Sequence, residues 1–228
     1  KIIENAITLL VNKEDVFSFL QLEKQRIAYV KLGDADHFPF LNMLQNYADI
    51  TPVEMTANDT IEKKLAAFNL VIVGYHKQDD HPWRNHKLNE QEIALLEQLS
   101  NTKNVILSVF ANPYSLLTIP SFQNFKSVLL AYQNSKLSQE ITAQMLFGAH
   151  ETKGKLPVSI KNEFYEGYGL LSSNLSRLSY GIPEEVGMSR QKLAEIDSIA
   201  TQVIGQEMAP GMQVLVAREG KVIFQKSY

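Results

Sequence analysis

The chain has 228 residues, of which 45% are hydrophobic and 21% are charged. This composition is close to that of average globular domains and excludes an intrinsically disordered chain, because disordered segments carry too few apolar residues to form a core. The 22 basic and 25 acidic residues give a net charge of −3, so nucleic acid is not an expected partner. The absence of cysteine excludes disulfides, thiolate metal sites and thiol nucleophiles.

The beginning of the chain suggests a piece of a longer protein. Lys1 is not an initiator methionine, and no signal-peptide pattern follows it. No apolar run approaches the ~20 residues that a membrane-spanning helix needs, so we expect no membrane span in this segment. The residues themselves leave the cellular compartment open.

Short β-branched runs alternate with amphipathic segments over residues 1–160, and this alternation is typical of a sheet with crossover helices. The runs that predict strands are 6–11, 27–32, 70–75, 105–110, 127–132 and 156–160. The segments that predict helices are 38–47, 59–68, 89–99 and 137–147, and the third begins with a capping box from Asn89 to Glu92. Continuous apolar runs indicate strands covered on both faces. The predicted fold class is therefore α/β, with a mostly parallel sheet sandwiched by helices.

A stretch rich in glycine, serine and proline at 161–187 interrupts this alternation and predicts a linker. After it, residues 189–204 carry apolar side chains at helical spacing, and 212–217 and 221–225 predict a β-hairpin. We therefore expect an α/β domain at 1–160, a linker at 161–187, and at 188–228 a C-terminal helix and β-hairpin from a truncated α+β domain. The second strand of such a hairpin offers an unpaired edge, which favours self-association through 188–228.

Four segments, taken in order, resemble the C-terminal α/β sandwich domain of family 3 glycoside hydrolases. They are residues 5–10 (NAITLL), 109–114 (VFANPY), 143–148 (AQMLFG) and 154–160 (GKLPVSI). The resemblance implies an upstream barrel domain in the same parent chain, a carbohydrate substrate and a retaining β-glycosidase whose nucleophilic Asp lies in the barrel. No Glu stands here in the context of the β-glucosidase-like branch, and this favours the β-N-acetylglucosaminidase branch.

Residues 209–217 (APGMQVLVA) and 220–224 (GKVIF) resemble the first strands of serine β-lactamase-like hydrolases, which have the penicillin-binding-protein fold. In that family the nucleophile lies in a Ser-x-x-Lys motif on a helix after these strands. Ser100 to Lys103 fits the letters but lies at the end of a predicted helix of the other domain, so we exclude it. The two resemblances together imply a fusion of a glycosidase with a β-lactamase-like hydrolase, and the family suggests the periplasm or cell envelope.

The densest chemical cluster follows the predicted strand at 70–75. Ligands of open α/β sheets gather at the carboxyl ends of the strands, which places the loop at 76–86 at the favoured edge. An aromatic ring can stack on a sugar, and charged side chains can bond its hydroxyls, so the candidate residues for substrate binding or contact with the barrel are Asp79, Asp80, Trp83 and Arg84. The alternative is a solvated insertion loop that the only tryptophan anchors to the domain.

Other polar residues give weaker signals. His76, His81 and His86 are spaced by five, which is not a helical ligand spacing, and no anionic cage surrounds them, so no metal or other cofactor is expected. His37 and His150 are isolated and predict surface or interface positions. Asp34 and Asp36 follow a predicted strand, and they are either turn-forming residues or a carboxylate pair for glycoside hydrolysis.

The sequence thus leaves two hypotheses of different class. In the first, the chain is the non-catalytic C-terminal domain of a β-glycosidase, and the isolated chain is inactive because both nucleophiles lie outside it. In the second, it is a carbohydrate-binding or scaffolding module without a glycosidase partner. Independent glycosidase activity would need a catalytic pair that the sequence does not reveal.

Overall fold

A computed structural model describes residues 1–13, 22–56, 59–78, 81, 83 and 85–228 of the chain. These residues form two compact units, Lys1–Leu175 and Ser176–Tyr228. The predicted linker at 161–187 is divided between them, and its first part, 161–175, belongs to the first unit.

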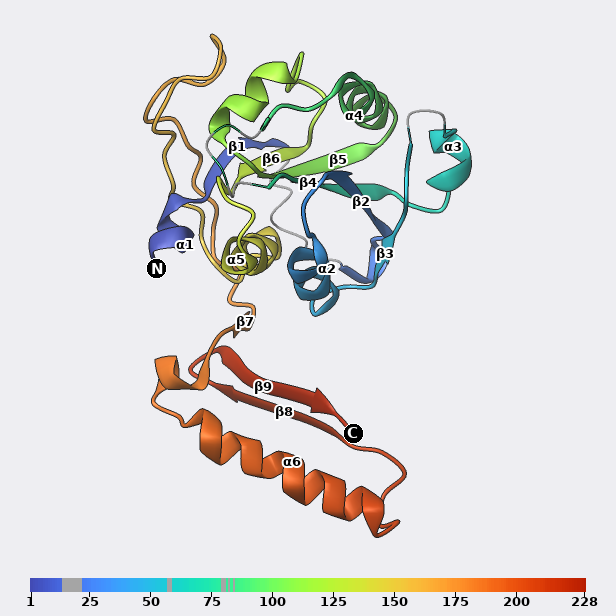
Figure 1. Cartoon of the computed structure of the whole chain (residues 1–228), viewed down its shortest axis with the longest axis vertical. Helices are drawn as coiled ribbons and strands as arrows, with labels where there is room; N and C mark the ends of the chain where they lie inside the picture. Colours follow the sequence, from blue (N-terminus) through green and yellow to red (C-terminus); the bar gives the residue numbers. More distant parts are fainter. Residues whose placement is uncertain (14–21, 57–58, 79–80, 82, 84) are drawn as a thin grey trace. The chain divides into compact units, whose positions relative to one another are not determined.

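The first unit contains a six-stranded sheet in the order β1-β6-β5-β4-β2-β3 (Figure 1). Its strands are β1 (Thr8–Asn12), β2 (Ile27–Gly33), β3 (Ile50–Pro52), β4 (Leu70–His76), β5 (Asn104–Phe110) and β6 (Ser127–Leu130). All neighbouring strands run parallel except β1 and β6, which are antiparallel. The α/β class and the mostly parallel sheet are therefore confirmed.

Helices cover both faces of this sheet, which is why its central strands consist of uninterrupted apolar runs. On one face lie α1 (Ile2–Ala6), α2 (Phe38–Gln45) and α5 (Lys136–Leu146), and on the other lie α3 (Ile61–Lys64) and α4 (Glu90–Thr102) (Figure 1). All seven residues of β4 are buried. Its side chains alternate between the two resulting cores, so the strand contributes to both.

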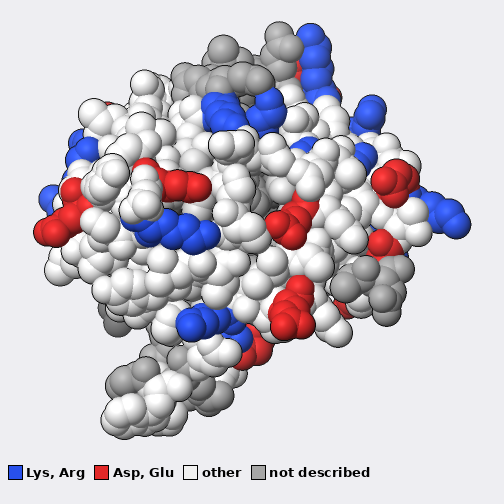
Figure 2. All heavy atoms as spheres, turned by 90° about the horizontal axis from the view of Figure 1, so that it is seen from above, with Lys and Arg blue, Asp and Glu red and all other residues white. Residues whose placement is uncertain are grey.

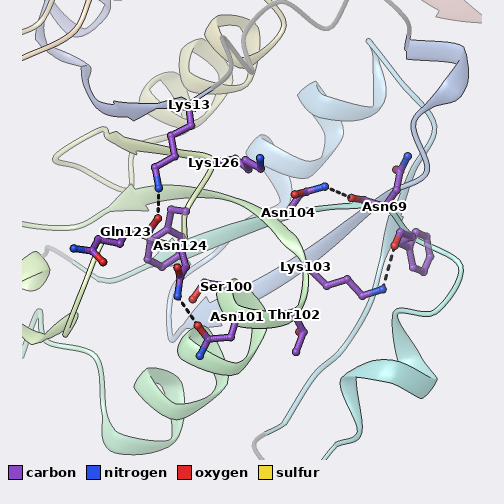
Figure 3. A pocket seen from close by; sticks show the side chains of 12 residues that line it. Lys13, Asn69, Ser100, Asn101, Thr102, Lys103, Asn104, Gln123, Asn124 and Lys126 are labelled. Atoms are coloured by element: carbon purple, nitrogen blue, oxygen red, sulfur yellow. Dashed lines mark hydrogen bonds between the residues drawn. The ribbon is translucent and has the colours of Figure 1, made fainter.

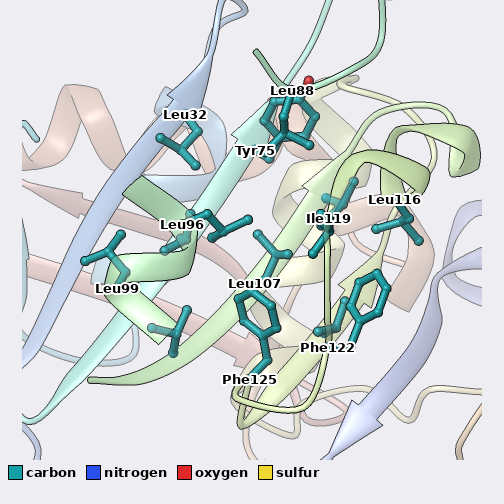
Figure 4. Close-up of a cluster of buried hydrophobic side chains, with 14 of the residues drawn as sticks. Leu32, Tyr75, Leu88, Leu96, Leu99, Leu107, Leu116, Ile119, Phe122 and Phe125 are labelled. Carbon is teal, nitrogen blue, oxygen red and sulfur yellow. The ribbon is translucent and has the colours of Figure 1, made fainter. Parts of the chain in front are cut away.

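The core under α4 shows how the helix pattern translates into packing (Figure 4). Leu96 and Leu99 lie on the buried stripe of α4 and face Leu107 of β5, and Phe125 completes the cluster. Each fully buried leucine of this kind contributes ~1.5–3 kcal/mol relative to an exposed one. The predicted capping box is confirmed at the start of the helix, where Asn89 accepts from the backbone N–H of Glu92.

Some predicted boundaries are wrong. Residues 156–160 form no strand of the sheet, because Pro157 lacks a backbone N–H for a ladder; Leu156 instead bonds the loop that returns at Gly167 and Tyr168. The helix expected at 59–68 is confined to Ile61–Lys64, and the short edge strand β3 has too little apolar sequence to be recognised.

Residues 150–175 are held on the first unit by specific contacts. The backbone N–H of Leu170 donates to Leu9 O of β1, and the Thr152 hydroxyl donates to that of Ser172 at 3.0 Å. An added Cβ at Gly154 would lie 2.3 Å from the backbone oxygen of Ala6, so only glycine permits this close approach. The glycine at position 154 therefore lets this stretch pack closely on the start of β1.

The second unit contains β7 (Ser179–Tyr180), the 3-10 helix η4 (Pro183–Val186), α6 (Arg190–Gly205), β8 (Gln213–Arg218) and β9 (Lys221–Ser227). The predicted order of a helix followed by a β-hairpin is confirmed. The expected open edge on the second hairpin strand is wrong, because β7 pairs in parallel with β9, and the open edge of the hairpin is that of β8. The hairpin turn places Glu219 and Gly220 at φ of 54° and 74°, as a type I′ turn requires. Leu193 of α6 packs with Ile223 of β9 in a small core.

Charged side chains of both signs are interspersed on the face of the molecule in Figure 2, in keeping with a net charge of only −3. No helix among the described residues is both long and apolar enough to cross a membrane.

Candidate functional site

The parallel strands of the first unit end side by side at one edge of the sheet. Gly33 of β2 lies opposite His76 of β4, and His76 lies opposite Phe110 of β5. The segments that follow these residues, with the segment after β6, therefore form a continuous surface, which we call the carboxyl rim. In open α/β sheets ligands bind at this edge.

A buried hydrogen-bonded chain lies under the carboxyl rim. His76 Nε2 lies 3.0 Å from the hydroxyl of Tyr29, and His76 Nδ1 lies 2.7 Å from Asn134 Oδ1. Because the Asn134 amide nitrogen donates to the carbonyl of Asp36 at 2.9 Å, its oxygen faces the imidazole. Nδ1 of His76 therefore carries the proton and donates, and Nε2 accepts from Tyr29.

The hydrogen-bonded series Tyr29–His76–Asn134 is electrically neutral. Burial lowers the pKa of His76 to about 3 and raises the pKa of Tyr29 well above its usual value. The imidazole also stacks on Phe110 with ring centroids 4.5 Å apart. Both ring nitrogens have partners, so His76 is not available to exchange protons with a substrate. These hydrogen bonds instead join the segment after β2 to the segment after β6.

The two carboxylates after β2 are each engaged locally. Asp34 accepts from Lys77 Nζ at 2.9 Å. Although burial raises the pKa of Asp34, the hydrogen bonds from Lys77 and Gln78 outweigh it, and this pKa lies below its usual value. Asp36 accepts from the backbone N–H of Phe38 at 3.0 Å at the start of α2. These contacts match the interpretation of both residues as turn and helix-start residues.

A cavity of about 520 Å³ opens beside the carboxyl rim, between β2, α2 and the segment after β3. Phe38 lines it and is 60% exposed, and the ring of His37 stacks on Phe38 at 4.6 Å. Burial and the nearby Lys31 lower the pKa of His37. Its Nδ1 is buried and has no hydrogen-bond partner among the described residues. Glu54 adds a carboxylate to the lining, so the cavity combines an aromatic wall with several polar groups.

The loop between β4 and α4 carries the predicted substrate-binding residues. Asp79, Asp80 and Arg84 lie outside the described residues. Trp83 is 89% exposed, so it is not an anchor in the core of its own unit. The loop starts at the same sheet edge as the Asn112-Pro113-Tyr114 turn.

That turn begins a short 3-10 helix, η3 (Pro113–Thr118). Asn112 Oδ1 accepts from the backbone N–H of Tyr114 at 3.0 Å, and the Tyr114 side chain is 44% exposed. The carboxyl rim therefore presents three exposed aromatic side chains, Phe38, Trp83 and Tyr114.

Sequence reasoning missed two features of the carboxyl rim. Glu92 closes the capping box through one carboxylate oxygen and accepts from the backbone N–H of Gly33 through the other, at 2.9 Å, so it ties α4 to the end of β2. The second missed feature is the burial of His76, which its position at the end of an apolar run could have indicated.

Among the residues that the structure describes, no three His, Cys, Asp or Glu side chains are grouped to hold a metal ion. The Ser100 hydroxyl donates to the carbonyl of Glu97, while Lys103 bonds Leu65 O and Phe68 O, so the Ser-x-x-Lys letters there carry no nucleophile.

Ser189 and Lys192 also fit the Ser-x-x-Lys motif, and the sequence analysis missed this match. The Ser189 side chain accepts from the backbone N–H of Lys192 and begins α6 as a helix cap. His150 lies 3.2 Å from Glu4 and is mostly buried.

Known proteins supply an independent comparison. Residues 7–189 match the Glycosyl hydrolase family 3 C-terminal domain. No protein of curated function matches the chain. The first unit is similar in fold to a β-N-acetylglucosaminidase of Paenibacillus sp. strain FPU-7, with 18% identity, a TM-score of 0.54, and coverage of 70% of this chain and 31% of that one.

Two further solved structures are similar in fold to this chain. The β-glucoside phosphorylase BglX gives 17% identity and a TM-score of 0.56, covering 73% of this chain and 32% of that one. A fungal multi-domain family 3 β-N-acetylglucosaminidase, described as carrying a GCN5-related glucosamine N-acetyltransferase region, gives 17% identity, a TM-score of 0.56, and coverage of 71% and 18%. The chain spans a third or less of these proteins. Because the family match extends over most of its length, the chain belongs to the Glycosyl hydrolase family 3 C-terminal domain family.

Proposed function

We propose that the first unit is the non-catalytic C-terminal domain of a retaining β-glycosidase, and that its carboxyl rim faces a carbohydrate site formed with an upstream barrel domain. The family match to residues 7–189 carries this proposal, since a C-terminal domain of this family implies an N-terminal catalytic partner. The aromatic and polar character of the carboxyl rim supports the orientation.

The chemistry of the carboxyl rim supports a non-catalytic role. A retaining glycosidase needs two carboxyl groups ~5–5.5 Å apart, one as nucleophile and one as acid and base. Asp34 is paired with Lys77, and Asp36 holds the start of α2, so neither is free for this work. Both catalytic groups would then come from the barrel, and the isolated chain is inactive.

Three exposed aromatic side chains give the carboxyl rim its proposed role. Phe38, Trp83 and Tyr114 offer flat apolar surfaces that suit either stacking on a sugar or packing against the barrel. Asp79, Asp80 and Arg84 belong to the same loop as Trp83, and we propose that they contact the substrate or the barrel.

For the parent enzyme we propose β-N-acetylglucosaminidase activity. Two of the similar structures carry that name, and a third is a β-glucoside phosphorylase, so the fold alone does not choose between them. The choice rests on the sequence, in which no Glu matches the context of the β-glucosidase-like branch.

For the second unit we propose that α6, β8 and β9 are the first elements of a β-lactamase-like hydrolase domain fused to the glycosidase. The helix followed by a hairpin agrees with that resemblance. Its nucleophile would lie after these strands, because Ser189 in the unit is engaged as a helix cap. A parent of this kind suits the periplasm or cell envelope.

The alternative is a carbohydrate-binding or scaffolding module that works without a glycosidase. The cavity beside Phe38 favours it, because an aromatic wall with Lys31, His37 and Glu54 is a suitable sugar site within this chain alone.

Fluorescence of the single tryptophan separates the two functions, because Trp83 is on the carboxyl rim itself. The purified chain is titrated with N-acetylglucosamine and glucose oligomers, and turnover of aryl β-glycosides and of β-lactams is measured alongside. We expect no turnover and no saturable change in emission. Saturable binding that Phe38→Ala abolishes would establish the alternative, and turnover that Asp34→Asn removes would refute the non-catalytic role.

A further inference from the structure

The opposite edge of the sheet, where the parallel strands begin, carries a row of cationic side chains. Arg26 directly precedes β2, Lys103 precedes β5 and Lys126 precedes β6. β1 runs in the opposite direction, so Lys13, which follows its last residue, lies at this same edge. Adjacent strands are ~4.8 Å apart, so these positions form a row along the sheet, with Asn69 before β4 interrupting it.

Two of these cations, Lys13 and Lys103, donate to backbone carbonyls. Lys13 Nζ donates to Gln123 O, and Lys103 Nζ donates to Leu65 O at 2.7 Å and Phe68 O at 3.3 Å. No carboxylate among the described residues pairs with Lys13 or Lys103. A carbonyl satisfies hydrogen-bond donors but, unlike a carboxylate, carries no negative charge to offset that of a lysine.

A hollow of about 700 Å³ lies at this edge (Figure 3). Its lining includes Lys13, Lys103 and Lys126, and among the described residues that line it there is no carboxylate. Side chains from the ends of β1 and α4 and from the segment before β6 surround it (Figure 3). The volume falls in the ~300–1,000 Å³ range of small-molecule sites.

Amide groups make up most of the remaining polar lining. The Asn124 amide nitrogen donates to the Asn101 amide oxygen, and this bond uses neither the nitrogen of Asn101 nor the oxygen of Asn124. The Gln123 amide can both donate and accept. The C-terminal end of α4 adds carbonyl groups that lack helical partners. The hollow thus offers cations for an oxyanion, and mixed donors and acceptors for hydroxyl groups.

We propose that this hollow binds a small, hydroxyl-rich oxyanion, of the class of phosphorylated or carboxylated sugars. The anionic group binds beside Lys13, Lys103 adds positive charge at the other end of the hollow, and the hydroxyls bond the amides of Asn101, Gln123 and Asn124. The site is at the opposite edge of the sheet from the carboxyl rim, and it depends on neither of the functions proposed above.

The test is an NMR titration of the ¹⁵N-labelled full chain with glucose 6-phosphate as the probe. Separate titrations use glucuronate, glucose and inorganic phosphate. We expect saturable shifts of the backbone amides of Asn101, Asn104 and Asn124 with the sugar phosphate, at millimolar concentration. Binding weakens about threefold when ionic strength rises beyond ~0.15 M, since the charges are partly exposed to solvent. A stronger response to glucuronate assigns the carboxylated sugars as the source of the oxyanion, and a stronger response to glucose 6-phosphate assigns the phosphorylated ones.

Lys13→Gln and Lys103→Gln each weaken binding about threefold or more, the usual effect of losing one partly exposed charge contact. Lys192→Gln, on α6 of the second unit, is the matched control and leaves binding unchanged. Lys103 also bonds two carbonyls, so Lys13→Gln decides the outcome if the Lys103 variant fails to fold. The proposal is overturned if none of the probes shifts these amides, if neutral glucose binds equally well, or if inorganic phosphate alone binds as tightly as the sugar phosphate.

Discussion

Replacing Gly74 by alanine tests whether the buried chain under the carboxyl rim has a fixed geometry. An added Cβ would lie 2.4 Å from His76 Nε2 and 2.7 Å from the Tyr29 hydroxyl, on the α2 and α5 face of β4. Both distances are far inside van der Waals contact, so the methyl group must separate the two side chains. The 3.0 Å hydrogen bond between them is then lost.

The expected cost combines three effects. Overpacking a dense core costs ~1–3 kcal/mol. A buried donor and acceptor left unsatisfied add ~1–3 kcal/mol. The lower backbone entropy of alanine in the unfolded chain reduces this loss of stability by ~0.5–1 kcal/mol. The net loss is about 3 kcal/mol, which shifts the midpoint of urea unfolding by about 1.5 M for an m-value of ~2 kcal/mol/M.

Urea unfolding of Gly74→Ala, Tyr29→Phe and the double variant measures this cost. Tyr29→Phe removes the hydroxyl that the new methyl group meets, so the double variant loses less than the sum of the singles, by about 1 kcal/mol. Gly205→Ala is the control, because nothing lies within 4 Å of its added Cβ. A Gly74→Ala stability within ~0.5 kcal/mol of the parent would refute the reasoning, since such a change is typical of unconstrained sites.

Three other predictions follow from the same structure. His76 is neutral when folded and has a pKa of about 3 there, so the unfolded chain binds the extra proton below pH ~6.5; stability therefore falls as pH drops below that value, by at most ~1.4 kcal/mol per pH unit from this residue. Urea midpoints in a pH series check this, and the His76→Phe variant is expected to lose less stability than the parent as pH falls from 6.5. Trp83→Ala leaves the free energy of unfolding within ~0.5 kcal/mol of the parent, because the side chain is 89% exposed; a larger loss in the same assay would show that it packs on its own unit. Deleting residues 176–228 leaves the first unit folded and reduces self-association through the open edge of β8, measured by circular dichroism and sedimentation; loss of cooperative unfolding would show that the two units share a core.

Local patterns in the sequence determined most of the elements. The apolar run of β4 predicted a strand covered on both faces, and all its residues are buried. Asn89 and Glu92 predicted the start of α4 through their spacing alone. These predictions succeeded because strands, caps and helical stripes depend on residues a few positions apart.

The carboxyl rim could be placed from sequence but not described. Parallel strands align their ends, so the position of Trp83 after β4 followed from chain order. The sequence could not predict that the carboxylates of Asp34 and Asp36 are hydrogen-bonded, because their partners are Lys77 and the backbone N–H of Phe38.

Only the tertiary structure decided the interactions between distant residues. Tyr29 and His76 are 47 positions apart, and His76 and Asn134 are 58 apart, so no periodicity marks them as one hydrogen-bonded chain. The cationic row is similar, because its members become neighbours only once the strand order is known. Sequence determines the elements through local geometry, whereas the order of strands in the sheet decides which side chains at their ends share a surface.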